Sequence, residues 1–139
     1  MPRVLGGTST MIIQDNLSDC KIHLQYRMPS SKEIISYRNG GMKRVKNNIE
    51  NRIGENRLEH GLKILTGIRD GDFQKRVDGN PVDISSDPKS KNYDPDWKNV
   101  IKEHASDLIE TLAVQVFDGS SQVVAPESAA SDGEDTEGN

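Results

Sequence analysis

Apolar and polar residues alternate strictly between residues 20 and 28, which is the clearest periodic pattern in the chain. The apolar members are Cys20, Ile22, Leu24, Tyr26 and Met28. Alternation with a period of two places these side chains on one face of a β-strand. The short β-branched stretch 11–14 precedes it, and residues 15–19 between them are rich in Asp and Asn, which favour turns. The pattern predicts an N-terminal β-hairpin.

Helical spacing begins after Pro29. Ser30 and Glu33 have the S-x-x-E spacing of a capping box, in which each side chain bonds a free amide of the first turn. A second pattern, with apolar residues three and four apart, covers 42–68 after the Gly40-Gly41 pair. Its members are Met42, Val45, Ile49, Ile53, Leu58, Leu62, Leu65 and Ile68. We interpret 42–68 as an amphipathic helix or a broken pair of helices that ends near Gly67.

A small second hairpin is predicted over 73–84. Asp78-Gly79 is a strong signal for a tight hairpin turn. Pro81 cannot donate a main-chain hydrogen bond, so the second strand of this hairpin should lie at a sheet edge.

The last predicted helix begins at Asp94-Pro95-Asp96 and runs for about six turns to Gly119. Asp94 is a suitable N-cap and Pro95 suits the first helical position. One face of this helix carries an apolar stripe. Its main members are Trp97, Ile101, Leu108, Leu112 and Val116, and His104 lies on the same face. Such a wide stripe needs a covering surface, either the 42–68 helix or another chain. These five residues are therefore the candidate protein-interface residues.

Composition limits the size of the core. Of 139 residues, 32% are apolar and 4% aromatic, which suits one α+β domain that is mainly helical. We expect a flexible N-terminus at 1–10, a single domain at 11–119 and a disordered acidic tail at 120–139. The tail holds five acidic residues and no Lys or Arg; without it, 17 acidic side chains face 18 basic ones. No apolar run is long enough for a transmembrane helix, and a lone Cys20 suits the reducing cytoplasm.

The reactive side chains do not form a recognisable catalytic or metal-binding pattern. Cys20 and His23 have a spacing seen in zinc sites, but no second pair matches it, and on a strand they face opposite sides. Cys20 should pack as a small apolar side chain, and His104 should be packed among the apolar residues of its helix. The sequence thus predicts no catalytic residue, no metal and no cofactor, and we expect a protein that is not an enzyme.

Basic residues gather in the 43–57 segment, namely Lys43, Arg44, Lys46, Arg52 and Arg57. A helix presenting them could follow nucleic-acid phosphates. Glu50, Glu55 and Glu59 interleave with them, however, and no aromatic side chain is near for base stacking. Mixed charge of this kind is typical of a solvated face. Nucleic-acid binding or regulation through a basic 43–57 helix is therefore the alternative function.

The order of features from 20 to 118 resembles that of small proteins encoded in the tail regions of Mu-like and related prophages, including tail assembly chaperones and tail accessory proteins. The segments that carry the resemblance are 24–31 (LQYRMPSS), Tyr37-Arg38-Asn39, Leu65-Thr66-Gly67-Ile68, the Asp78-Gly79 turn and Asp94-Pro95-Asp96-Trp97. The resemblance implies a non-catalytic role in the host cytoplasm, binding the tape-measure or tail tube protein during assembly. It assigns no individual functional residue.

We expect a protein-binding adaptor. The 97–116 stripe and the acidic tail lead us to predict a homo-oligomer or a stable complex with a protein partner, with no membrane association.

Overall fold

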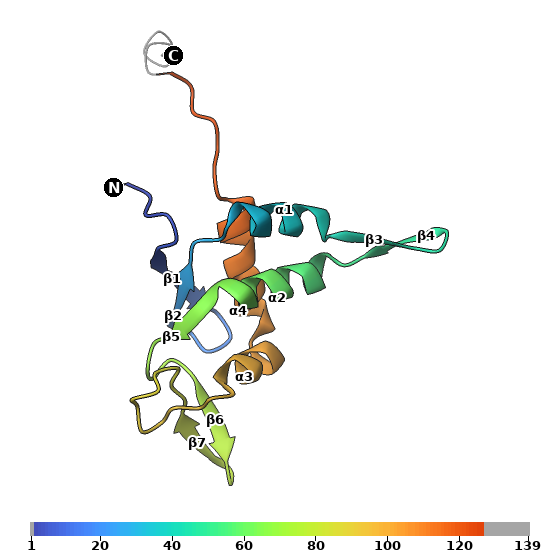
Figure 1. Ribbon diagram of the computed structural model, residues 1–139. Helices are drawn as coiled ribbons and strands as arrows, with labels where there is room; N and C mark the ends of the chain where they lie inside the picture. Colours follow the sequence, from blue (N-terminus) through green and yellow to red (C-terminus); the bar gives the residue numbers. More distant parts are fainter. Residues whose placement is uncertain (1, 127–139) are drawn as a thin grey trace.

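The computed structural model describes residues 2–126, and its centre is a three-stranded antiparallel sheet (Figure 1). Strand β1 (Thr8–Asp15) pairs with β2 (Cys20–Arg27), which also pairs with β5 (Leu65–Ile68), giving the order β1-β2-β5. The predicted N-terminal hairpin is confirmed, with Met11 opposite Leu24. β1 starts at Thr8, however, so residues 8–10 of the segment that we expected to be flexible belong to the strand.

Helix α1 (Ser31–Asn39) follows β2 and begins as the capping box predicts. The Glu33 amide donates to Ser30 Oγ over 3.2 Å, and the Ser30 amide donates to Glu33 Oε1 over 2.9 Å. Each side chain thus satisfies one of the amides that a helix N-terminus leaves without a partner.

The prediction of helical structure over 42–68 is confirmed for 53–64 and wrong on either side of it. Strands β3 (Met42–Val45) and β4 (Asn48–Asn51) form a hairpin, and helix α2 (Ile53–Ile64) and strand β5 follow it. Lys46, at the two-residue turn between β3 and β4, has a φ of 57°, which a continuous helix would not contain. The apolar residues three and four apart in 42–53 therefore mark no helical face.

The second predicted hairpin is confirmed. Strands β6 (Gln74–Val77) and β7 (Asn80–Asp83) pair antiparallel, and Asp78 and Gly79 at the turn have φ angles of 54° and 83°. Two successive residues with positive φ are the geometry that a tight hairpin turn requires. Of the described residues, 34% are helical and 30% are strand in three small sheets. The protein is α+β, but the prediction that it is mainly helical is wrong.

The last helical segment is broken rather than continuous. Helix α3 (Trp97–His104) ends at Ala105, whose φ and ψ of −139° and 36° are not helical, and helix α4 (Ser106–Ala113) continues as a π-helical turn η1 (Val114–Asp118). Asp94 is not the N-cap of α3, because Asp96 holds that place. Instead, the Asp94 carboxylate accepts hydrogen bonds from Lys75 Nζ at 2.7 Å and from the Asp96 amide at 2.9 Å.

The core lies where α2 crosses α4 beside the sheet (Figure 1). Residues 120–126, after η1, are exposed. Most of the predicted acidic tail, 127–139, lies outside the described residues. The buried apolar side chains are Ile22, Leu24, Tyr37, Ile64, Leu65, Ile68, Ile84, Trp97, Ile101, Leu108, Ile109, Leu112, Ala113, Val116 and Phe117.

Candidate functional site: a projecting basic hairpin

The hairpin β3–β4 projects away from the body of the molecule, beyond the ends of α1 and α2 (Figure 1). We call residues 42–51 the arm. Every residue of the arm is exposed, and none belongs to the core. The base of the arm is fixed, since the Arg52 amide donates to the Gly41 carbonyl over 2.9 Å and the Ile53 amide donates to Asn51 Oδ1 over 3.0 Å. The arm is thus anchored at its root and free along its length.

The two faces of the arm differ in chemistry. Arg44 lies opposite Ile49 and Met42 lies opposite Asn51, so these four side chains share one face. Met42 and Ile49 are 57% and 66% exposed on it. The other face pairs Lys43 with Glu50 and Val45 with Asn48. One face therefore presents two apolar side chains around a guanidinium, which is a combination enriched at protein interfaces.

The five basic residues that the sequence grouped together are not equivalent. Lys43, Arg44 and Lys46 lie on the arm and form no ion pair with any residue in 2–126. Arg52 lies at the root and is neutralised by Glu55 at 2.7 Å and Glu50 at 3.6 Å.

Arg57 lies on α2 beside the Tyr37 hydroxyl, away from the arm. The predicted basic 43–57 helix therefore does not exist, and three of its five cations gather on the arm instead.

A groove of about 710 Å³ runs from the root of the arm along the outer side of α2. Met42 and Lys43 line its arm end, Leu58 and Leu62 line its α2 side, and Lys102 of α3 also lines it. Glu59 and Lys63 on its rim are ion-paired at 3.4 Å. The groove adjoins the apolar face of the arm through Met42, and most of its other lining side chains are charged or polar.

The predicted interface residues lie elsewhere. Trp97, Ile101, Leu108, Leu112 and Val116 are all buried in the core, where α2, the sheet and neighbouring helices cover them. The stripe is wider than one helix can cover, as the sequence indicates, but the chain's own elements complete the cover. Because they are buried, these residues cannot contact a partner directly and can only pack beneath a surface that does. Their role in an interface stays a prediction.

Aromatic residues missed by the sequence analysis join α1, α2 and η1. The rings of Tyr37 and Phe117 stack with centroids 4.6 Å apart, and the buried His60 meets both edge-on. Burial raises the pKa of Tyr37, and its hydrogen bond to Asp118, at 2.9 Å, acts in the same direction. The spacing of Tyr37 and His60 along their helices gave no signal for this contact, because the residues are 23 positions apart.

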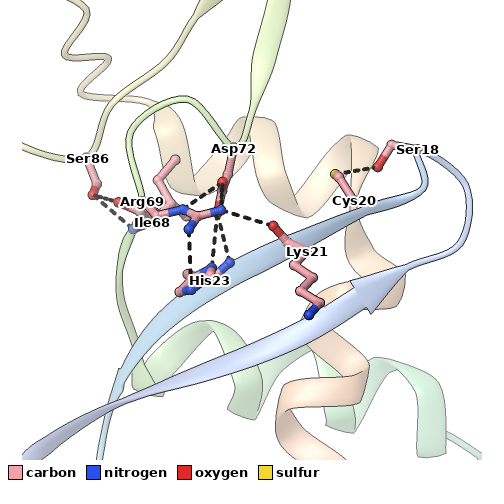
Figure 2. A network of polar contacts seen from close by, with 8 residues as sticks. All are labelled: Ser18, Cys20, Lys21, His23, Ile68, Arg69, Asp72 and Ser86. Carbon is pink, nitrogen blue, oxygen red and sulfur yellow. Dashed lines mark hydrogen bonds and ion pairs between the residues drawn. The ribbon is translucent and has the colours of Figure 1, made fainter.

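Polar residues around His23 of β2, chiefly Arg69 and Asp72, form a hydrogen-bonded network (Figure 2). Asp72 accepts a hydrogen bond from the His23 main-chain amide at 2.8 Å and is held by Arg69 at 2.7 Å. Cys20 lies apart from it, with Sγ 2.9 Å from Ser18 Oγ, and is exposed rather than packed as we expected. His104 is also misplaced by the prediction: its side chain is 78% exposed.

Within residues 2–126, no three His, Cys, Asp or Glu side chains come together as metal ligands could. In the same part of the chain, no helix is both long enough and apolar enough to cross a bilayer. The chain matches no protein-family model, no curated protein and no solved structure.

Proposed function

We propose that this protein is a non-catalytic protein-binding module whose contact surface is the apolar face of the arm together with the groove at its root. The observation that carries the proposal is the exposure of Met42 and Ile49 on a hairpin that contributes nothing to the core.

The energetics of a free hairpin support this role. Ordering a residue costs about 1–2 kcal/mol of conformational entropy, and a lone two-stranded hairpin is marginally stable at best. No residue of the arm belongs to the core cluster, so packing in the core does not offset this cost. A partner that covers Met42 and Ile49 supplies the missing apolar burial, so binding stabilises the arm and the contact together.

The partner's chemistry follows from the arm. Its site should offer an apolar depression for Met42 and Ile49, with carboxylates placed for Arg44 and Lys46. The tape-measure or tail tube protein of a Mu-like prophage, in the host cytoplasm, is the partner that the sequence resemblance implies. That assignment stays a proposal that rests on the sequence segments alone.

Nucleic-acid binding is the second candidate, and one observation favours it. Lys43, Arg44 and Lys46 gather without ion pairs on a two-stranded ribbon, and the major groove of DNA admits such a ribbon. The exposed Met42 and Ile49 favour the protein partner, because phosphate contacts leave apolar side chains uncovered.

The test compares three forms of the protein as bait in lysate of its native source, with bound proteins identified by mass spectrometry. Met42→Ser with Ile49→Ser removes the apolar face of the arm, and Ile35→Ser, at an exposed position on α1, is the matched control. We expect wild type and control to retain a partner that the double variant loses, with equal melting temperatures for all three. The same proteins bound by all three forms would contradict the proposal.

A DNA-binding measurement distinguishes the second candidate. Replacing Lys43, Arg44 and Lys46 with Gln should leave the protein complex weakened but present. If instead wild type binds DNA with a steep salt dependence that this triple variant loses, the nucleic-acid function is supported.

A further inference from the structure

The two edges of the central sheet differ in how far their outer main-chain groups are hydrogen-bonded. At β5, the Ser86 hydroxyl accepts a hydrogen bond from the Ile68 amide at 3.0 Å and lies 3.3 Å from the Ile68 carbonyl oxygen, to which it donates (Figure 2). Beyond the end of β5, the Asp72 carboxylate takes the place of a strand by accepting from the His23 amide. Side chains thus occupy main-chain groups at the C-terminal end of this edge.

The opposite edge, at β1, is open. In the described part of the chain, the main-chain hydrogen bonds of β1 run to β2 alone, and Gly7 extends the pairing to Met28. The strand is eight residues long and contains no Lys, Arg, Pro or Gly. Its one charge is Asp15 at the end, and Ile12, at its centre, is 59% exposed.

Natural proteins protect edge strands with lysines, prolines, bulges or covering segments, because free amides and carbonyls pair readily with another chain. β1 has none of the first three, and its side chains alternate between exposed and half-buried without a break. An edge left in this form is suited to strand addition.

We propose that β1 pairs antiparallel with β1 of a second copy of this chain. With the two-fold axis at Ile12, Ile12 lies opposite its own counterpart, Thr10 lies opposite Gln14, and Met11 lies opposite Ile13. This register keeps both core faces on one side of a continuous sheet in the order β5-β2-β1-β1-β2-β5.

The charges support a second copy as the occupant. In this register Asp15 lies opposite Ser9, so no like charges meet along the paired strands. The outward face of the joint carries Thr10, Ile12 and Gln14 from each copy, and the two Ile12 side chains cover one another. An isologous contact of this kind closes on itself and gives a dimer.

Cysteine cross-linking tests the register directly, in a Cys20→Ser background. Ile12→Cys should form a disulfide-linked dimer under mild oxidation. Thr10→Cys and Gln14→Cys should each form no disulfide-linked dimer alone, because neither thiol faces its own counterpart, but should cross-link when mixed. Leu17→Cys, in the exposed turn after β1, is the control for random collision and should cross-link no faster than free thiols do in solution.

Sedimentation of the uncross-linked protein completes the test. Wild type should be dimeric, Ile12→Lys should be monomeric because two lysines would face one another, and Ile35→Lys on α1 should remain dimeric. The arm variant Met42→Ser/Ile49→Ser should also remain dimeric, which separates this inference from the proposed function. A monomeric wild type would overturn it, as would a dimer that survives Ile12→Lys and shows no Ile12→Cys cross-link.

Discussion

Gly61 on α2 lies directly against the main chain of Ile109 on α4. A β-carbon at position 61 would be 2.6 Å from the Ile109 carbonyl oxygen and 2.7 Å from Ile109 Cγ2. Both residues are buried, so neither main chain can move aside toward solvent. The absence of a side chain at this position is what lets the two central helices approach closely.

Gly61→Ala should therefore destabilise the protein, although alanine favours helices over glycine by about 1 kcal/mol. We expect a net loss of about 1–3 kcal/mol in the free energy of unfolding, as is usual for overpacking a core. Gly54→Ala, on the same helix, is the control, because the nearest atom to its β-carbon would be Glu110 Oε1 at 3.7 Å. Urea unfolding should show the control to be neutral or stabilised. Equal effects at both positions would contradict this account.

Acid should weaken the fold through Glu33. Hydrogen bonds from Arg27, 2.7 Å to each carboxylate oxygen, lower the pKa of Glu33 from its ordinary value of 4.5 to about 2. Because the folded pKa is the lower one, the unfolded chain binds more protons in that window. The stabilisation is present above pH 4.5 and is lost as the pH falls toward 2.

Glu33→Gln measures this contribution. We expect it to lower the free energy of unfolding at pH 7 by about 1–2 kcal/mol, since Arg27 is partly exposed and solvent screens the pair, and to flatten the acid dependence. Glu59→Gln, which breaks an exposed pair with Lys63, should have little effect. Parallel acid profiles for wild type and Glu33→Gln would assign the acid sensitivity to other groups.

Shortening a buried side chain of the 97–116 stripe should lower the free energy of unfolding. Leu112 is fully buried, and Leu112→Ala should cost about 2–5 kcal/mol through lost burial and the cavity that remains. Ile35→Ala, at a position that is 56% exposed, should change the free energy of unfolding by less than about 0.5 kcal/mol. Thermal unfolding with denaturant series is the measurement. If Leu112→Ala were as stable as wild type, the conclusion that the stripe is part of the core would be contradicted.

Asp72 lies in a loop, but its side chain should contribute strongly to the stability of the fold. Its side chain is nearly buried and satisfies both the His23 amide and Arg69. Asp72→Ala leaves that amide without a partner, and we expect a loss of about 1–3 kcal/mol. Asp83→Ala, which removes an exposed hydrogen bond with Gln74, is the control and should be nearly neutral. Hydrogen exchange at the His23 amide should also accelerate in the Asp72 variant and not in the control.

Local signals in the sequence determined several elements. The alternation over 20–28, the Ser30–Glu33 spacing and the Asp78-Gly79 turn each correspond to the expected element in the structure. These signals act between residues close in the chain, through side-chain direction, amide capping and allowed φ angles. Nothing distant has to be known for them to be interpreted correctly.

Tertiary structure decided the rest. The three-and-four spacing of Met42, Val45 and Ile49 predicts a helix only if those side chains share a buried face, and on the exposed arm no core selects between helix and strand. The same limit applies to the stripe at 97–116: its apolar width was evident from the sequence, but whether α2 or another chain covers it depends on packing between residues far apart. Burial, and with it the free surface at which a partner binds, is a property of the assembled chain.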